Sequence, residues 1–251
     1  MNKNSVDIIL PVFNSYNFID STLNSIFQQT YNNWNLLIID DASTDGTTKK
    51  IQDLIKRSKL KKKILFYKNY KNKGQAYCRN FLLKKAKSEF IAFIDSDDLW
   101  KKNKLNKQIK FMHKNFYHFT YTDYETLMKD KKKKIFLPNF FNYQKFIRNT
   151  SISTSSMIIR KNFLNNVNFA EIRYCEDYYF KCKILKKIDA YKCPNNFLIY
   201  RIRKNSLQSN RLKVLNSLWI INKNLNKMNF ISNFLSVLFI IYNSLKKYAF
   251  R

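Results

Sequence analysis

Two carboxylates separated by one residue follow a short apolar run. Asp95, Ser96 and Asp97 come directly after residues 90–94, a run typical of a strand buried on both faces. Presented on one turn, the two aspartates can reach the same site, and their oxygens suit Mg²⁺ or Mn²⁺, which also bind diphosphate oxygens. An isolated Asp-x-Asp is more often a capped turn, so the rest of the sequence must decide between a metal site and a cap.

A second acidic pair ends another apolar run. Asp40 and Asp41 follow residues 34–39, and a carboxylate there can accept hydrogen bonds from a nucleobase or a ribose hydroxyl. The competing interpretation is a helix cap built by residues 43–45. Burying carboxylates in a crevice without a use is costly, which favours a ligand.

Two further groups carry charge at expected turns. Gly74 permits close backbone approach, and Arg79 nearby supplies a cation for phosphate. Glu176 and Asp177 open an expected helix, where they either complement its dipole or present a catalytic base at the edge of a site. Spacing alone favours the dipole.

The elements that position these groups alternate between strand and helix. Strands are predicted at 6–13, 34–39, 63–67 and 90–94, with amphipathic helices between them. This alternation predicts an α/β protein with a parallel sheet, right-handed crossovers and ligands at the carboxyl ends of the strands. Both acidic pairs lie at such ends, so we expect them to share one crevice. Asn14 and Ser15 are expected to cap the first helix.

Beyond residue 100 the pattern is less regular. The expected elements are a helix near 101–115, a hairpin with the lysine run 131–134 at its tip, a strand at 155–160, a helix at 177–187, and short strands at 190–193 and 197–202.

Residues 229–248 are densely apolar but are interrupted by Asn233, Ser236 and Asn243. The segment is too short and too polar for a transmembrane span. It is predicted to be either an amphipathic helix on a membrane or a helix packed on the domain.

The charge and cysteine content of the chain limit which classes of partner and which compartment we expect. The chain has 251 residues and a formal net charge of +30, from 47 Lys and Arg against 17 Asp and Glu. Such a chain is drawn to phosphorylated ligands, acidic lipids or nucleic acid, unless the lysines are simply dispersed over the surface. Four cysteines without a C-x-x-C pair predict free thiols, which fits the cytoplasm. The first apolar run reads as a strand, so no signal peptide is expected.

In combination, these motifs resemble the opening of the family 2 glycosyltransferases of GT-A fold. The resemblance covers roughly residues 5–210 and is specific over the first hundred. The motifs that carry it are residues 8–14, 28–31, 37–47, 72–76, 79–80 and 93–98, with weaker matches at 168–171, 176–178, 200–201 and 206. Departures from the family pattern are Ala42 in place of Gly, Cys78 in place of Ala, Ala170 in place of Asp, and Arg203 in place of His.

The resemblance implies a Rossmann-like GT-A domain over 1–210, with a mostly parallel central sheet flanked by helices. The apolar pattern of the last segment adds a helical extension over 211–251 that either associates with a membrane or packs on the domain. It implies an inverting transferase that uses a nucleotide-sugar donor, with UDP the first candidate, and Mn²⁺ or Mg²⁺ on the diphosphate. The implied roles are Pro11, Val12, Phe13 and Asn14 at the nucleotide, Asp41 at the base, Gly74 and Arg79 along the nucleotide, Asp95 and Ser96 at the donor, Asp97 at the metal, Asp177 as general base, and Glu176 as its positioning partner.

The resemblance further implies a glycan or lipid-linked acceptor for cell-surface polysaccharide. The basic surface and the C-terminal apolar segment would hold such an enzyme at the cytoplasmic face of an anionic membrane, as a peripheral protein. The alternatives are a nucleic-acid-binding protein, a sugar nucleotidyltransferase and a transferase that only binds. No RNP, KH or zinc-finger pattern supports the first, so no nucleic acid partner is expected. An early Gly-rich phosphate loop is missing for the second, and the intact Asp41, Asp95, Asp97 and Asp177 argue against the third.

Overall fold

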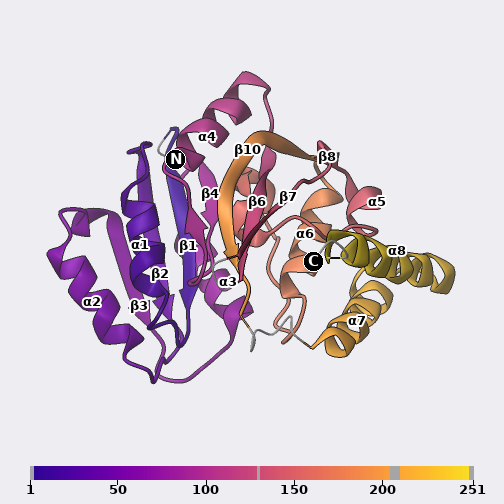
Figure 1. Ribbon diagram of the computed structural model, residues 1–251, viewed down its shortest axis with the longest axis horizontal. Coiled ribbons are helices and arrows are strands. Elements are labelled where there is room, and N and C mark those ends of the chain that lie inside the picture. Colours follow the sequence, from indigo (N-terminus) through magenta and orange to yellow (C-terminus); the bar gives the residue numbers. More distant parts are fainter. Residues whose placement is uncertain (1–2, 129–130, 204–209, 249–251) are drawn as a thin grey trace.

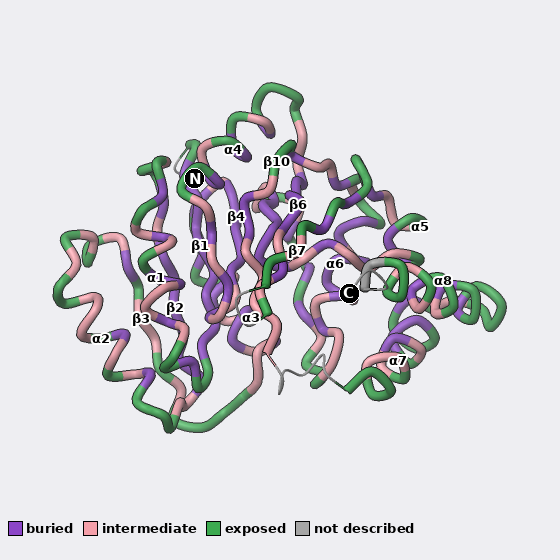
Figure 2. The backbone as a smooth tube through the Cα atoms, in the orientation of Figure 1, coloured by how far each residue is buried: buried purple, intermediate pink, exposed green. Residues whose placement is uncertain are grey.

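A parallel β-sheet forms the first half of the molecule. A computed structural model describes residues 3–128, 131–203 and 210–248 (Figure 1). Its first four long strands run parallel in the order β3-β2-β1-β4. Their bounds are β1 (Val6–Val12), β2 (Trp34–Asp40), β3 (Ile64–Lys68) and β4 (Phe90–Phe93). The four predicted strands are thereby confirmed, and Figure 2 shows β1, β2 and β4 as largely buried, whereas β3 at the edge of the sheet is mostly part-exposed.

Helices join and cover these strands. They are α1 (Ile19–Phe27), α2 (Thr47–Arg57), α3 (Gln75–Lys85) and α4 (Lys104–Lys114). The inward face of α1 carries Ile19, Leu23 and Ile26, at the predicted helical spacing. The predicted cap by Asn14 and Ser15 is wrong. The helix begins after Phe18 without a side-chain cap, because the Ser15 carbonyl already accepts the N–H groups of residues 18 and 19.

The second half extends the same sheet. Its full order is β3-β2-β1-β4-β9-β6-β10-β5, with β7 on β6 and β8 on β10. The β6–β10 ladder is parallel, so most paired residues lie in parallel ladders, while shorter strands join antiparallel. The added strands are β5 (Leu99–Trp100), β6 (Phe119–Met128), β7 (Lys131–Ile135), β8 (Phe140–Phe141), β9 (Ile158–Arg160) and β10 (Ala190–Arg201).

Three predictions in this half need correction. The lysine run is not a hairpin tip but strand β7 itself, and the connection to β6 falls on residues 129–130, outside the described part. The strand expected at 155–160 covers only 158–160, because 154–156 form a 3₁₀ turn. The two short strands expected after residue 190 are one strand, β10, with shifts in register between Cys193 and Leu198.

The remaining helices and helical turns complete the molecule. They are η1 (Lys61–Lys63), α5 (Tyr143–Phe146), η2 (Thr154–Ser156), η3 (Lys161–Leu164), α6 (Glu176–Leu185), α7 (Arg211–Ile220), a π-helical turn (Ile221–Leu225) and α8 (Phe230–Tyr248). Helix α6 agrees with the predicted helix at 177–187 to within two residues at each end.

Helix α8 turns polar side chains toward the protein and most of its apolar side chains toward solvent. Asn233 and Ser236, each 1% exposed, face the protein and bond to main-chain carbonyls of Trp219 and Ile147. The opposite face is apolar and exposed, and its outer turns are green in Figure 2. Its exposed residues are Phe230, Ile231, Phe234, Leu235, Leu238, Phe239, Tyr242 and Leu245. Within the described residues, no helix is both long and apolar enough to cross a bilayer.

Candidate active site

The loops after β1 and β2 are tied to each other. The Asn14 side chain accepts the Thr44 N–H at 2.9 Å, and the Asn14 N–H donates to Ser43 Oγ at 2.9 Å. Pro11 and Val12 are buried within β1, whereas the next side chain, Phe13, is 46% exposed at the edge of the sheet. These four residues therefore lie at and just beyond the carboxyl end of β1, the edge of the sheet where the strand order predicts ligands.

Asp41 organises the next loop. Its carboxylate accepts the backbone N–H groups of Lys73 and Gly74 at 2.9 and 2.8 Å and the Asn69 amide at 2.7 Å. Gly74 has φ +89°, which side chains rarely adopt, and nothing lies within 4 Å of an added Cβ. The glycine is thus required by its backbone angle rather than by crowding. The neighbouring Asp40 is fully buried and accepts from the hydroxyls of Ser43 and Thr48. The Thr47 N–H, at the start of α2, donates to Asp45 at 3.0 Å, so Asp45 is the residue of the expected cap that bonds to a helix N–H.

Ala42 lies between the two loops with φ +61°. A left-handed backbone is unfavourable for any residue with a Cβ. This is the position where the family pattern has glycine, so Ala42 holds a backbone angle that glycine adopts more readily.

Arg79 joins two acidic groups that are far apart in sequence. Its guanidinium, 3% exposed, lies 2.6 Å from Asp95 and 2.8 Å from Glu176. Burial raises the pKa of Glu176 to about 7, against the lowering effect of Arg79. Asp95 also accepts the Gln75 amide at 3.2 Å. A cation that neutralises two carboxylates is what keeps this part of the site charged yet buried.

The Asp95-Ser96-Asp97 turn presents its members differently. Asp95 and Asp97 keep 24% and 14% of their side chains exposed. Ser96 is buried, with its Oγ 2.6 Å from Ser15 Oγ, so it faces into the fold. Asp97 lies 2.6 Å from Arg203. Burial raises the pKa of Asp97, while Arg203 opposes that shift.

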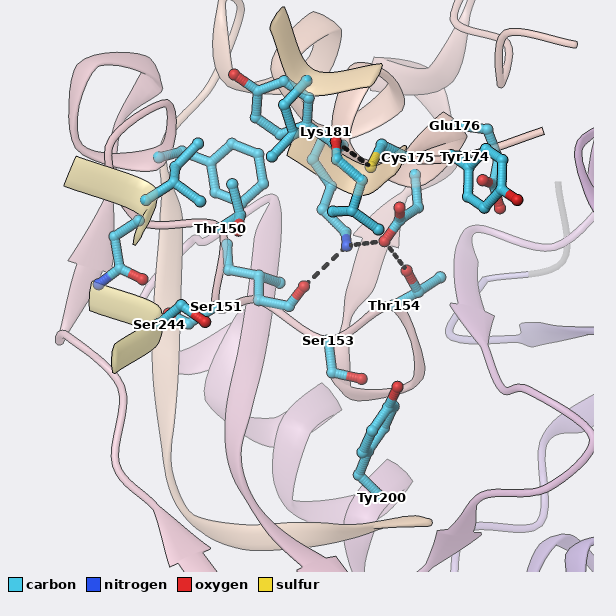
Figure 3. A pocket seen from close by; sticks show the side chains of 18 of the residues that line it. Thr150, Ser151, Ser153, Thr154, Tyr174, Cys175, Glu176, Lys181, Tyr200 and Ser244 are labelled. Carbon is cyan, nitrogen blue, oxygen red and sulfur yellow. Dashed lines mark hydrogen bonds and ion pairs between the residues drawn. The ribbon is translucent and has the colours of Figure 1, made fainter. Parts of the chain in front are cut away.

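Asp177 is held in an ionised state. Its carboxylate lies 2.7 Å from Lys181, one turn along α6, and accepts the Thr154 hydroxyl at 3.0 Å. Burial alone would raise the pKa of Asp177, but Lys181 overcomes it and lowers the pKa to about 2. Lys181 also donates to the Ile152 carbonyl at 2.8 Å. The dashed lines in Figure 3 trace this network from the loop through Lys181 to Thr154.

One cavity of about 580 Å³ joins these groups. Its wall includes Arg79, Asp95, Glu176 and Asp177, so the structure brings these predicted residues together. The remaining predicted residues lie outside this wall, at neighbouring strand ends or in the loops above: Pro11, Val12, Phe13, Asn14, Asp41, Gly74, Ser96 and Asp97. Ser206, a weak motif match, lies outside the described residues.

Two residues of the site were missed by sequence reasoning. Lys181 and Thr154 are the partners that set the charge of Asp177. The signal for Lys181 was present, because Asp177 and Lys181 are four residues apart on an expected helix and such pairs meet on one face. Thr154 is 23 residues away in sequence and had no local signal.

Among known protein families, the one described as Glycosyl transferase family 2 matches residues 7–171 of this chain. The chain belongs to this glycosyltransferase family. It is therefore an enzyme that transfers sugar groups, and the resemblance in the sequence is confirmed.

Curated relatives extend this assignment over nearly the whole chain. One is the *Escherichia coli* protein named UDP-Glc:alpha-D-GlcNAc-diphosphoundecaprenol beta-1,3-glucosyltransferase WfgD, 35% identical over 98% of this chain and 95% of its own. Another is the *Bacillus subtilis* putative teichuronic acid biosynthesis glycosyltransferase TuaG, 31% identical over 91% of both chains.

Solved structures of low sequence identity share the fold. *Staphylococcus aureus* TarS 1-349 in complex with UDP-GlcNAc has a TM-score of 0.73 and 18% identity, covering 96% of this chain and 73% of its own. The mannosyltransferase PcManGT of *Pyrobaculum calidifontis*, in complex with GDP-Man and Mn²⁺, has a TM-score of 0.69 and 17% identity, covering 89% and 64%. The predicted GT-A fold with its C-terminal helix is thereby confirmed.

Proposed function

We propose that this enzyme transfers a hexose from a UDP-sugar to a hydroxyl of a lipid-linked diphosphate sugar during synthesis of a surface polysaccharide, with inversion at the anomeric carbon. The observation that carries the proposal is the single cavity that joins Asp95 and Arg79, at the end of the parallel sheet, to Asp177 on α6. The substrates are those in the name of the *E. coli* relative, which aligns over almost the full length of this chain.

On the donor side, the loops built by Asn14 and Asp41 form the nucleotide pocket. Pro11, Val12 and Phe13 provide its wall, and the Lys73-Gly74 backbone, fixed by Asp41, provides its second edge. Arg79 and Asp95 then lie along the ribose and diphosphate, with Ser96 supporting the turn from within. These are the roles that the family resemblance implies for the residues.

The carboxylates fit a divalent metal that the donor helps to hold. Asp95 and Asp97 are partly exposed at a strand end and offer hard oxygen ligands. Within the described residues no cluster of three or more His, Cys, Asp or Glu side chains could hold an ion alone. Mg²⁺ and Mn²⁺ commonly complete their shells with phosphate oxygens, so Asp97 would be the principal protein ligand. When bound, the ion would neutralise charge on the leaving diphosphate.

On the acceptor side, Asp177 is the general base. The acceptor oxygen forms a bond to the anomeric carbon as the bond from that carbon to the diphosphate breaks, and UDP leaves with the electron pair. The acceptor hydroxyl becomes strongly acidic as this bond forms, so the ionised Asp177 can take its proton despite a pKa of about 2. Glu176 holds Arg79 in place and is the second candidate for the base.

The C-terminal helices place the enzyme on the inner face of a membrane. Residues 190–251 contain no Asp or Glu, and α8 exposes an apolar face along its length. A helix that exposes an apolar face beside cationic residues suits the boundary of an anionic bilayer. On this proposal residues 1–210 carry the chemistry, residues 211–251 carry the membrane contact, and the excess positive charge serves lipid rather than nucleic acid.

A thermal-shift panel of UDP, GDP and dTDP, with and without Mn²⁺, tests the donor site. A ligand that binds only the native state raises the melting temperature by mass action. We expect UDP to give the largest rise, larger still with Mn²⁺, and UDP-glucose then to release UDP with a lipid-linked acceptor. Release of pyrophosphate would indicate a nucleotidyltransferase, and no rise with any nucleotide would overturn the proposed function.

A further inference from the structure

The cavity extends well beyond the groups that do the chemistry. We call the part of the cavity that the two C-terminal helices line the arm. Its roof consists of the apolar side chains Val214, Leu215 and Leu218 of α7, and Ile240 and Ile241 of α8, together with Leu245, which is also exposed to solvent. Figure 1 shows α7 and α8 together at one side of the molecule, away from α2 and β3. The donor site needs no such arm, because the nucleotide is placed at the ends of β1, β2 and β4.

The cavity also holds more positive charge than its carboxylates require. Glu176 is paired with Arg79, and Asp177 with Lys181. Two further arginines line the cavity, Arg173 before α6 and Arg211 at the start of α7. Within the described residues neither forms an ion pair with a carboxylate, and both are exposed. They are free to meet an anion that enters the cavity.

The cavity wall therefore combines three kinds of side chain: carboxylates and hydroxyls, two arginines without a carboxylate partner, and the apolar side chains of α7 and α8. The hydroxyl groups come from η2 and the loop before it, where Figure 3 labels Thr150, Ser151, Ser153 and Thr154 along the cavity. A sugar joined through a diphosphate to a long hydrocarbon chain has three parts that match these three kinds of lining.

We infer that the arm beneath α7 and α8 is the lipid subsite of the acceptor. Arg173 and Arg211 bind its diphosphate, and the roof residues enclose the first carbons of its hydrocarbon chain. The inference rests on the proposed function for the identity of the acceptor. It adds that the enzyme recognises the lipid itself, and that one helix pair contacts the membrane on its outer side and the acceptor chain on its inner side.

Binding of two probes tests the subsite without turnover. Undecyl diphosphate, kept below its aggregation concentration, and methyl diphosphate are titrated into the full-length protein saturated with UDP and Mn²⁺, and heat is measured. We expect undecyl diphosphate to bind at least about tenfold more tightly, because enclosing two or more methylene groups is worth that factor. Equal affinities, or no binding of either probe, would overturn the inference.

Matched variants separate the arm from the exposed face of α8. Ser244→Trp places an indole at the edge of the arm, whereas Ser232→Trp places the same group on the same helix outside the cavity wall. We expect Ser244→Trp to remove the preference for the undecyl probe and Ser232→Trp to retain it. Equal behaviour of the two variants would assign the preference to the outer face and refute the subsite.

A second pair of variants tests the arginines that line the cavity. Arg211→Glu should weaken both diphosphate probes about tenfold, while Lys213→Glu, exposed on the same helix but outside the cavity wall, should leave both unchanged. Equal effects of the two reversals would refute the role of Arg211. The UDP thermal shift, measured on the same samples, distinguishes failure of the subsite from failure of the proposed function. A normal UDP shift without binding of either probe would refute only the subsite, whereas an absent UDP shift would refute the proposed function.

Discussion

Lys104 is the least expected charge in the protein and gives a sharp test of the structure. It is fully buried on α4, donates to Gln108 at 3.1 Å, and lies 4.2 Å from the centre of the Trp100 ring. Within the described residues no carboxylate is within ion-pair range of it. Burial lowers the pKa of Lys104 from 10.5 to about 7.

The sign of the effect follows from linkage. The native state releases the Lys104 proton near pH 7, whereas the unfolded chain keeps it to about pH 10.5. The destabilisation is therefore complete below pH 7 and disappears as the pH rises to 10.5. At about 1.36 kcal/mol for each pH unit, the fall in pKa corresponds to roughly 5 kcal/mol of unfolding free energy.

Lys104→Met should remove this penalty. In this variant the loss of the hydrogen bond to Gln108 lowers the unfolding free energy by about 1–3 kcal/mol, but that cost does not depend on pH. The stability of the variant relative to the native protein should therefore fall by about 1.4 kcal/mol per pH unit between pH 7.5 and 9.5. Urea denaturation at a series of pH values measures this difference. Lys110→Met, an exposed lysine on the same helix, is the control and should show no such slope. A flat difference for Lys104→Met would refute the assignment of a depressed pKa.

Four further predictions concern the site and its loops. Ala42→Gly should raise the unfolding free energy by up to about 1 kcal/mol, since φ is +61° at this position; a lower value in urea denaturation would contradict the strain. Lys181→Met should raise the pKa of Asp177, moving the acid limb of the kcat/KM profile toward neutral pH, while Lys181→Arg should not; superimposable profiles would place the base elsewhere. Asp97→Asn should abolish turnover at saturating Mn²⁺ with Tm little changed; full activity would remove its metal role. Asp177→Asn should keep the UDP thermal shift but lose transfer; normal transfer would favour Glu176 as the base.

The fold was predictable where the sequence carries a two-sided apolar signal. Residues 34–39 and 90–94 are apolar without alternation, because both faces of a central parallel strand are covered. The lysine run 131–134 gave the opposite signal and was misread, although it forms strand β7. In the described sheet β7 pairs on one side only, with β6, and lysines on such an edge discourage pairing with other chains. Exposure alone does not distinguish an edge strand from a turn.

The site was predictable as far as single motifs could place it. Asp95 was expected at the site from its position at a strand end. Asp177 was expected there only from the family resemblance, because its position at a helix start favoured a role at the helix dipole. Arg79, by contrast, contacts Asp95 and Glu176 across 16 and 97 residues of sequence. The pairing depends on how α3 and α6 pack, so no local pattern contains it. The same holds for the pKa values, since those of Glu176 and Asp177 move in opposite directions although the residues are adjacent.

Helix α8 shows why an average over a segment can mislead. Asn233, Ser236 and Asn243 look like interruptions of an apolar run, which is why the sequence left a membrane helix and a packed helix open. In the structure all three bond to main-chain carbonyls of neighbouring elements, so the polar residues are the ones that hold the helix to the protein. Burying a polar side chain is tolerable only where a partner is waiting. Once those three contacts fix the orientation, Ile240 faces inward with them and most of the other apolar residues of the helix face outward. A contiguous apolar face of this kind calls for an apolar partner such as the bilayer in which the acceptor lipid is held.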